Sequence, residues 1–147
     1  MSKTTLDLST LSDITDGAHT VKVKAKADGY RDSEFSNEVS YTKAVSKTLT
    51  FTGARTDFLG GSETYAKIGS APTSNNDYQY KYSQGGTYDF TGSVDVYIWG
   101  NNGANSGMYE LNGTSQTNYV RVNGWNSPTK LTVTESTLIC LYQAAMM

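Results

Sequence analysis

The residues best suited to bind a ligand lie in two short segments, 94–99 and 119–125. In 94–99 and 119–123 aliphatic side chains alternate with aromatic or polar ones, and Trp125 lies just beyond the second alternation. Because successive side chains of a β-strand point to opposite faces, each segment predicts one aliphatic face for a core and one face of aromatic and polar groups. The candidate ligand-binding residues on these second faces are Asp95, Tyr97, Trp99, Tyr119, Arg121, Asn123 and Trp125.

This combination of side chains suits a carbohydrate. Flat aromatic rings stack on the apolar faces of pyranose rings, while amides, carboxylates and guanidinium groups form directed hydrogen bonds with hydroxyls. The same residue types are enriched at protein interfaces, and aromatic rows also pack against neighbouring sheets. The sequence therefore leaves three roles open for these faces: glycan contact, a protein interface, or packing within the chain.

The sequence shows no motif for catalysis or for metal binding. Its one histidine and one cysteine, His19 and Cys140, are far apart and both lie at strand-like positions, which argues against a nucleophile pair or a zinc site. Cys140, set among apolar residues, is expected to be a buried small hydrophobe. Asp89, Asp95 and Glu110 occur singly, outside any motif for glycoside hydrolysis. We expect a non-enzymatic protein with no cofactor and no metal.

The composition indicates a β-rich protein with a polar surface. Of the 147 residues 37% are hydrophobic, and Gly, Ser, Thr, Asn and Tyr are abundant. The formal net charge of −2 gives no electrostatic reason for nucleic-acid binding. No apolar run reaches the length of a membrane span, and residues 1–7 lack the apolar core of a signal peptide. We therefore expect neither nucleic-acid binding nor membrane insertion.

Short alternating segments predict strands throughout the second part of the chain. Gly, Asn and Pro cluster between these segments, as in the turns of antiparallel sheets, and residues 88–90 are ambiguous. The strands expected there are 48–52, 65–68, 78–82, 94–99, 108–111, 119–123, 130–134 and 138–142. The last strand is apolar on both faces and is expected to be central. The pattern predicts an all-β fold in which residues 48–147 form a jelly-roll-like β-sandwich.

A further set of strands is predicted near the N-terminus. Valine and alanine alternate with lysine in 19–27, and apolar and polar residues alternate again in 37–42, after a polar loop. These two segments predict a pair of half-buried antiparallel strands. Leu6 and Leu8 predict a third strand upstream, before a turn at residues 16–17.

The N-terminal strands resemble the last three strands of a fibronectin type III domain. The residues that carry the resemblance are Leu6 to Leu8, Leu11, 16–25 and 36–41. It covers residues 5–43 only, and 24–37 is similar to modules in structural proteins of tailed phages and in surface proteins of Gram-positive gut bacteria. In the family, the position of His19 usually holds a tyrosine whose hydroxyl bonds back near the preceding leucine. This chain departs from the family at that tyrosine corner.

A complete domain of that family has four further strands, and the chain begins at Met1 without them. Three strands with one apolar face cannot bury that face alone, because a sandwich core needs the inner faces of two sheets. The C-terminal domain, another copy or a different protein must cover it, and we favour another copy or a partner. The predicted assembly face consists of Leu6, Leu8, Val21, Val23, Val39 and Tyr41.

We expect a partial fibronectin type III-like module in 1–43, a linker in 44–47 and a β-sandwich domain in 48–147. The resemblance implies a non-enzymatic structural protein of a phage virion, such as a head decoration, head fibre or tail-associated protein. Such a protein assembles with further copies or other virion subunits and displays its sandwich on the virion surface, for contact with a host surface or glycan. The alternative is a carbohydrate-binding module or adhesin fragment of a bacterial surface protein, located on the bacterial cell surface.

Overall fold

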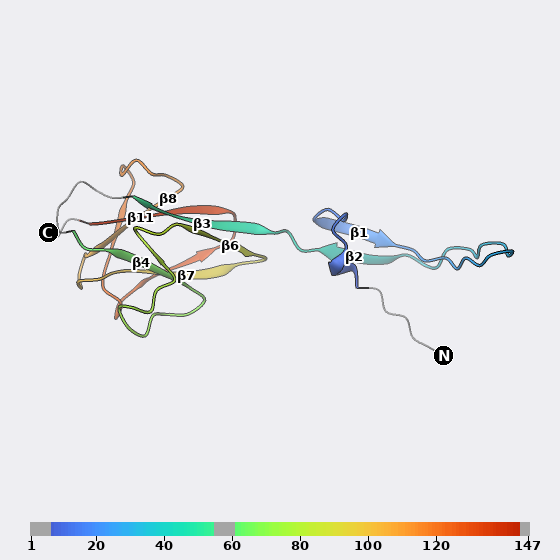
Figure 1. Cartoon of the computed structure of the whole chain (residues 1–147), viewed down its shortest axis with the longest axis horizontal. Helices are drawn as coiled ribbons and strands as arrows, with labels where there is room; N and C mark the ends of the chain where they lie inside the picture. Colours follow the sequence, from blue (N-terminus) through green and yellow to red (C-terminus); the bar gives the residue numbers. More distant parts are fainter. Residues whose placement is uncertain (1–6, 55–60, 145–147) are drawn as a thin grey trace. The chain divides into compact units, whose positions relative to one another are not determined.

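The computed structural model describes residues 7–54 and 61–144 (Figure 1). The chain divides into two compact units, Met1–Val45 and Ser46–Met147, and the boundary lies within the linker that the sequence predicts. The described residues form eleven strands and one short 3₁₀ helix, and none forms an α-helix, which confirms the all-β prediction. In this part of the chain no helix is long and apolar enough to cross a membrane.

The N-terminal unit contains one antiparallel hairpin. Its strands are β1 (Gly17–Val21) and β2 (Val39–Lys43). The register places Val21 opposite Val39 and His19 opposite Tyr41, so these four side chains share one face. The two strands predicted here are confirmed, although their regular ladder is shorter than predicted. The hairpin of residues 17–43 is called the ribbon below.

Past Val21 the two arms of the ribbon stay paired, but the ladder becomes irregular. Ser36 donates its N–H to the Val23 carbonyl (2.7 Å) and accepts the Val23 N–H at its hydroxyl (3.0 Å). Ser33 makes the same two bonds with Ala25 (3.0 and 2.8 Å). Between these bonds one arm advances by three residues and the other by two, so the longer arm bulges. The alternation within the first arm could not reveal this, because the extra residues lie on the other arm.

The prediction of a third strand upstream is wrong at Leu8. This residue lies in a 3₁₀ helix, η1 (Leu8–Thr10), and Leu6 lies outside the described residues. The Thr10 hydroxyl donates to the Asp7 carbonyl (2.8 Å). Local bonds of this kind from a threonine side chain compete with strand pairing, and two alternating leucines are too weak a pattern to override them.

His19 makes a backward hydrogen bond to the segment that precedes β1. Its Nε2 lies 2.6 Å from the Thr15 carbonyl, four residues upstream. A carbonyl only accepts, so Nε2 carries the proton. The ring therefore ties the strand to the preceding segment, as a tyrosine corner does. Lys43 adds a second tie, because its Nζ donates to the Ile14 carbonyl (2.6 Å).

The C-terminal unit contains two packed sheets (Figure 1). The five-stranded sheet has the order β6 (Gly86–Phe90), β3 (Lys47–Ala54), β11 (Thr137–Tyr142), β8 (Gly107–Leu111), β9 (Val120–Val122). The four-stranded sheet has the order β10 (Thr129–Val133), β7 (Val94–Gly100), β4 (Thr64–Ile68), β5 (Tyr80–Lys81). Neighbouring strands are antiparallel except β3 and β11, which are parallel. β11 is central, as its two apolar faces predict.

The inner faces of both sheets supply one core. Its fully buried members include Leu49, Phe51, Ala66, Val96, Ile98, Ile139 and Leu141. Val96 and Ile98 confirm that the aliphatic face of 94–99 points inward. Phe51 also stacks on Tyr80, with ring centroids 4.0 Å apart. Complete burial of each large aliphatic side chain contributes about 2 kcal/mol, so this core is the main source of stability in the unit.

A smaller cluster covers the other face of β11. Its buried members are Met108, Cys140, Tyr142 and Ala144. The Tyr142 hydroxyl donates to Glu110 Oε2 (2.8 Å), and the Gln116 N–H donates to the same oxygen (2.9 Å). These bonds tie the connection between β8 and β9 to the sheet. Both faces of β11 are apolar because one face packs in the main core and the other in this cluster. Cys140 is buried, as predicted, and its thiol is free.

Candidate ligand-binding surface

The two predicted faces of aromatic and polar residues lie on different sheets. β7, which carries Asp95, Tyr97 and Trp99, belongs to the four-stranded sheet, whereas β9, which carries Arg121, is an edge of the five-stranded sheet. Since the aliphatic faces of both sheets meet in the core, their opposite faces point away from each other. The seven candidate residues therefore do not form one surface. Alternation shows which side chains share a face of a strand, but not which sheet that strand joins.

Trp99 is fully buried, with an exposed fraction of 0%, so its predicted role in stacking on a ligand is wrong. Its ring meets Tyr65 edge-on at 6.0 Å, and Tyr65 stacks on Tyr78 at 4.4 Å. The connection between β4 and β5 folds onto this face, where Asp77 pairs with Lys67 (2.7 Å). Alternation placed Trp99 on the side away from the core, but it could not show that a connection covers that side.

Asp95 and Tyr97 lie on the outer face of the four-stranded sheet and are half-buried. Asp95 accepts from Lys130 Nζ (2.9 Å) and from the Thr132 hydroxyl (2.8 Å) on the neighbouring strand. The Lys130 ammonium and, after it, the Thr132 hydroxyl lower the pKa of Asp95. Tyr97 stands between Lys67 and Lys130 in the register. This face is a cross-strand polar network, in which Asp95 already has two partners.

Three of the remaining candidates, Tyr119, Arg121 and Asn123, are linked at the β9 edge of the other sheet, and Trp125 follows two residues after Asn123. Arg121 Nη1 donates to the Asn105 carbonyl (3.1 Å), and its guanidinium lies 6.0 Å from the centre of the Tyr119 ring. The Asn105 N–H donates to Asn123 Oδ1 (3.1 Å), which joins the loop before β8 to the end of β9. Tyr119 and Trp125 are 46% and 41% exposed. These five residues are called the β9 surface below.

The β9 surface offers both kinds of contact that a sugar ring needs. Tyr119 and Trp125 supply partly exposed rings for stacking. Arg121 and Asn123 supply polar groups that the backbone of Asn105 already holds in place, so binding costs them less side-chain freedom. The sequence did not identify Asn105. The available signal was its place in a loop rich in Asn and Gly, where it adopts a φ of 52° that asparagine tolerates.

The single carboxylates are each engaged and lie on three different strands. Asp89 on β6 accepts from the Thr48 hydroxyl (2.7 Å), Asp95 on β7 pairs with Lys130, and Glu110 on β8 is buried beneath Tyr142. A pair of carboxylates across a cleft, as glycoside hydrolysis requires, is therefore not formed by these residues. In 7–54 and 61–144, no three His, Cys, Asp or Glu side chains cluster closely enough to hold a metal ion.

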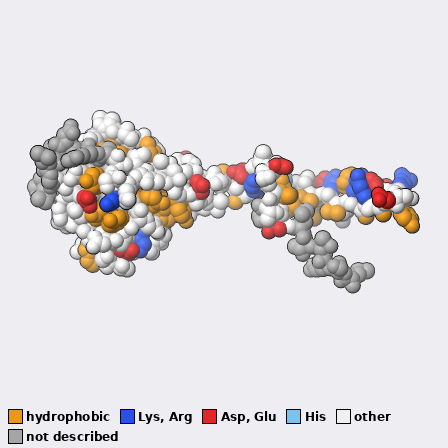
Figure 2. All heavy atoms as spheres, viewed as in Figure 1, with side chains coloured by type: hydrophobic (Ala, Val, Ile, Leu, Met, Phe, Trp, Pro, Cys, Tyr) orange, Lys and Arg blue, Asp and Glu red, His pale blue; other side chains and the backbone are white. Residues whose placement is uncertain are grey.

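The predicted assembly face is largely open. Val23 is 61% exposed and Val39 is 65% exposed, while Leu8, Val21 and Tyr41 are half-buried. Figure 2 shows hydrophobic side chains (orange) at the surface along the ribbon. The sequence did not single out two further exposed side chains there, Phe35 (61%) and Tyr30 at the turn.

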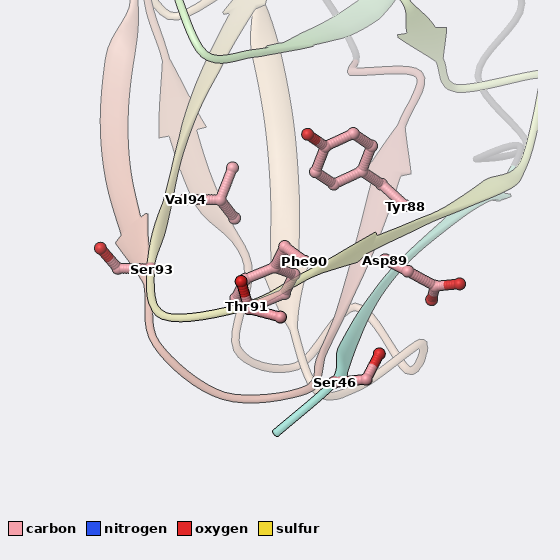
Figure 3. Close-up of a pocket in the computed structure, with 7 residues that line it drawn as sticks. All are labelled: Ser46, Tyr88, Asp89, Phe90, Thr91, Ser93 and Val94. Carbon is pink, nitrogen blue, oxygen red and sulfur yellow. The ribbon is translucent and has the colours of Figure 1, made fainter. Parts of the chain in front are cut away.

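A hollow of about 500 Å³ lies at the end of the sandwich where β6 turns into β7 (Figure 3). Its lining residues are Ser46, Tyr88, Asp89, Phe90, Thr91, Ser93 and Val94. Tyr88 lies opposite the core residue Leu49 in the register, so Tyr88 and Phe90 are on the core side of β6 and Asp89 is on the other. The sequence left this strand ambiguous and did not predict the hollow.

Comparison with known proteins gave no match: no family model matches the chain, and neither a curated protein nor a solved structure shows significant similarity.

Proposed function

We propose that this chain is a non-enzymatic structural protein that joins other subunits through its N-terminal ribbon and displays its C-terminal sandwich. The observation that carries the proposal is the exposure of the apolar side chains of the ribbon. Val23, Phe35 and Val39 are 61%, 61% and 65% exposed. Val23 and Val39 belong to the predicted assembly face, whereas the Phe35 ring lies 5.3 Å from Lys24 Nζ. An isolated two-stranded hairpin is marginally stable, and exposed apolar side chains along it mark an interaction surface.

Apolar contact alone does not hold two ribbons together. Burying the exposed parts of three such side chains contributes on the order of 3 kcal/mol. Association itself costs about 4–15 kcal/mol in lost freedom of motion. A partner must therefore also supply backbone hydrogen bonds, or several ribbons must bind at once. Both requirements favour a repetitive assembly over a single small contact.

The resemblance of residues 5–43 to modules of tailed-phage structural proteins supports the setting of this assembly. We place the protein on the virion surface, as a head decoration, head fibre or tail-associated subunit, with further copies or other virion subunits as its partners. In that setting the sandwich contacts a host surface or glycan. The β9 surface supports this part of the proposal, because it combines exposed rings with held polar groups.

The second candidate is a carbohydrate-binding module or adhesin of a bacterial surface protein. The same β9 surface supports it. The two candidates differ at the ribbon, because an adhesin module has its ribbon covered by other parts of its own long chain. A bacterial surface module therefore binds glycan without forming oligomers, whereas a virion subunit forms oligomers with or without glycan.

Light scattering of the full chain over a concentration series tests the proposal. We expect a mass above that of the monomer, and we expect Val39→Asp to lower it, because the change puts a charge on the apolar face. Ser40→Asp is the matched control, since the neighbouring residue faces the opposite side of the ribbon and is also exposed. A monomer at every concentration, or equal effects of the two variants, would overturn the proposal.

A further inference from the structure

The C-terminal unit has four edge strands, and three of them are protected from pairing with another chain. β9 and β5 have only three and two residues, and β10 carries the exposed Lys130 directly after Pro128 and Thr129. Short length, lysine and nearby proline are the means by which natural sheets block edge pairing. β6 has five residues, contains neither lysine nor proline, and pairs with β3 without a bulge. It is the exposed edge best able to accept another strand.

The two sides of β6 differ in chemistry. Tyr88 and Phe90 face the core side of the strand, whereas Thr87 and Asp89 face the other side. Tyr88, Asp89 and Phe90 all border the hollow at the end of the sandwich (Figure 3). The Tyr80 hydroxyl reaches the Thr87 carbonyl only at 3.5 Å, so Tyr88 to Phe90 are the open part of the edge. A strand added beside β6 would place alternate side chains over the hollow and the others beside Asp89.

The first arm of the ribbon has the matching pattern. In residues 20–27, valine and alanine occupy one side and Lys22, Lys24 and Lys26 the other. Val23 and Ala25 direct their backbone groups to the second arm, so the backbone groups of the lysines point to the outer edge of the ribbon. That outer edge can therefore form a new ladder while the ribbon itself stays paired.

We propose that β6 of one copy receives residues 20–27 of a second copy as an added strand. Val21, Val23 and Ala25 then face Tyr88 and the hollow, and the lysine row lies beside Asp89. Within the described residues Asp89 accepts a hydrogen bond from Thr48 but forms no ion pair. Lys26 is 69% exposed and reaches its nearest carboxylate, Asp32, only at 3.8 Å. Lys22 and Lys24 already pair with Glu38 and Asp32 (2.8 Å each), so Lys26 is the lysine of the row that is free to pair closely with Asp89.

This inference rests on the proposed function, since it names the receiving surface for the ribbon. A ribbon bound to a different surface on the next copy is a heterologous contact. Such contacts repeat head to tail and give either a closed ring or an open row. Apolar contact alone does not hold the ribbon to a partner, and β6 supplies the backbone hydrogen bonds that are also needed.

Cysteine crosslinking between differently labelled copies tests this arrangement. One full-length variant carries Val23→Cys or Ala25→Cys, so that either register is sampled, and the other carries Tyr88→Cys. Neighbouring strands bring paired positions within disulfide range. The native Cys140 is fully buried and is present in both partners. Val120→Cys on β9 is the matched control, because Val120 is 46% exposed and Tyr88 41%, on opposite edges of the same sheet.

We expect mixed oxidation to give several-fold more ribbon-to-Tyr88 crosslinks than ribbon-to-Val120 crosslinks or ribbon-to-ribbon crosslinks. Equal crosslinking at both edges, or a majority of ribbon-to-ribbon products, would overturn the β6 site. Light scattering of the unmodified chain separates the two claims. An oligomer without the β6 crosslink overturns this inference alone, whereas a monomer at every concentration overturns the proposed function and this inference with it.

Discussion

The Asp77 carboxylate accepts hydrogen bonds from the Lys67 ammonium (2.7 Å) and from the backbone N–H and hydroxyl of Thr73 (2.8 and 3.0 Å). These bonds, with that from Lys67 the strongest influence, lower the pKa of Asp77 from 3.8 to about 2. They also hold the connection between β4 and β5 onto the outer face of the sheet, above the buried Trp99. Asp77 thus helps to keep the connection in place over Trp99, which is why Trp99 cannot contact a ligand although it points away from the core.

We predict that an NMR titration gives Asp77 a pKa of about 2 and that Lys67→Met raises it toward 3.8. Because the folded state prefers the charged carboxylate, its contribution to stability is complete above pH 3.8 and is lost as the pH falls through about 2. Asp77→Asn should remove that part of the acid sensitivity. A titration midpoint near 3.8 in the unmodified protein would contradict this explanation.

A buried carboxylate holds the connection on the other sheet. Glu110 is 2% exposed and accepts from Tyr142, whose hydroxyl has a pKa raised by burial. We predict that Tyr142→Phe lowers the free energy of unfolding by about 1–3 kcal/mol, because Glu110 loses a donor that water cannot replace. Urea unfolding followed by tryptophan fluorescence measures this. Tyr97→Phe is the control, since Tyr97 is half-buried on an outer face. Equal effects of the two variants would refute the role of the Glu110 bond.

Among the elements, the ribbon carries the proposed function, and His19 ties its first strand to the preceding segment. We predict that His19→Phe raises the amide exchange rates of β1, because it removes the bond to the Thr15 carbonyl, a contribution of about 1 kcal/mol. His19→Tyr, whose hydroxyl can also donate to the Thr15 carbonyl, should keep the slow exchange. Native-state hydrogen exchange measures both. Unchanged exchange in His19→Phe would show that the bond does not secure the strand.

The sequence was sufficient to predict a strand where the alternation of apolar and polar residues was long, or where both faces of a segment were apolar. The alternation in 94–99 located β7, and the two apolar faces of 138–142 located β11 at a sheet centre. Strand pairing was not predictable, because it depends on contacts between distant segments. The tyrosines of 78–82 predicted a five-residue strand, but only Tyr80–Lys81 is in the sheet, since Tyr78 instead stacks on Tyr65.

The candidate site was predictable only in part, for the same reason. Tyr119, Arg121 and Asn123 could be grouped because they occupy alternate positions of one segment, and Trp125 lies just beyond it. Trp99 was wrongly included, because a connection far along the chain covers it. Asn105 was omitted, because its link to Arg121 comes from a loop turn that no periodic pattern records. Local patterns reveal which residues share a face, and tertiary contacts decide which faces are open.

The β9 surface gives a prediction about glycan contact. We expect the full chain to be retained by some glycans on an array, and we expect Trp125→Ala to weaken that binding by up to about tenfold, since an aromatic contact contributes about 0.5–1.5 kcal/mol. Tyr97→Ala, on the outer face of the other sheet, is the control and should bind normally. Absence of retention, or equal loss in both variants, would count against a glycan role for this surface.

At the scale of the whole molecule, the two units differ in how far their apolar side chains are buried. The C-terminal unit buries them between two sheets, whereas the N-terminal unit leaves Val23, Phe35 and Val39 exposed. A hairpin of this kind becomes stable when a partner covers it. Under the proposed function, the N-terminal unit becomes well ordered only when a partner covers the ribbon.

Hydrogen–deuterium exchange of the full chain at high and low protein concentration tests this claim most directly. The account predicts that amides of the ribbon exchange more slowly at high concentration, with β6 protected in parallel and β9 unchanged. Protection of the ribbon without β6 would retain assembly and move its receiving surface elsewhere. Ribbon exchange that is the same at every concentration would contradict the claim that this protein assembles through its N-terminal unit.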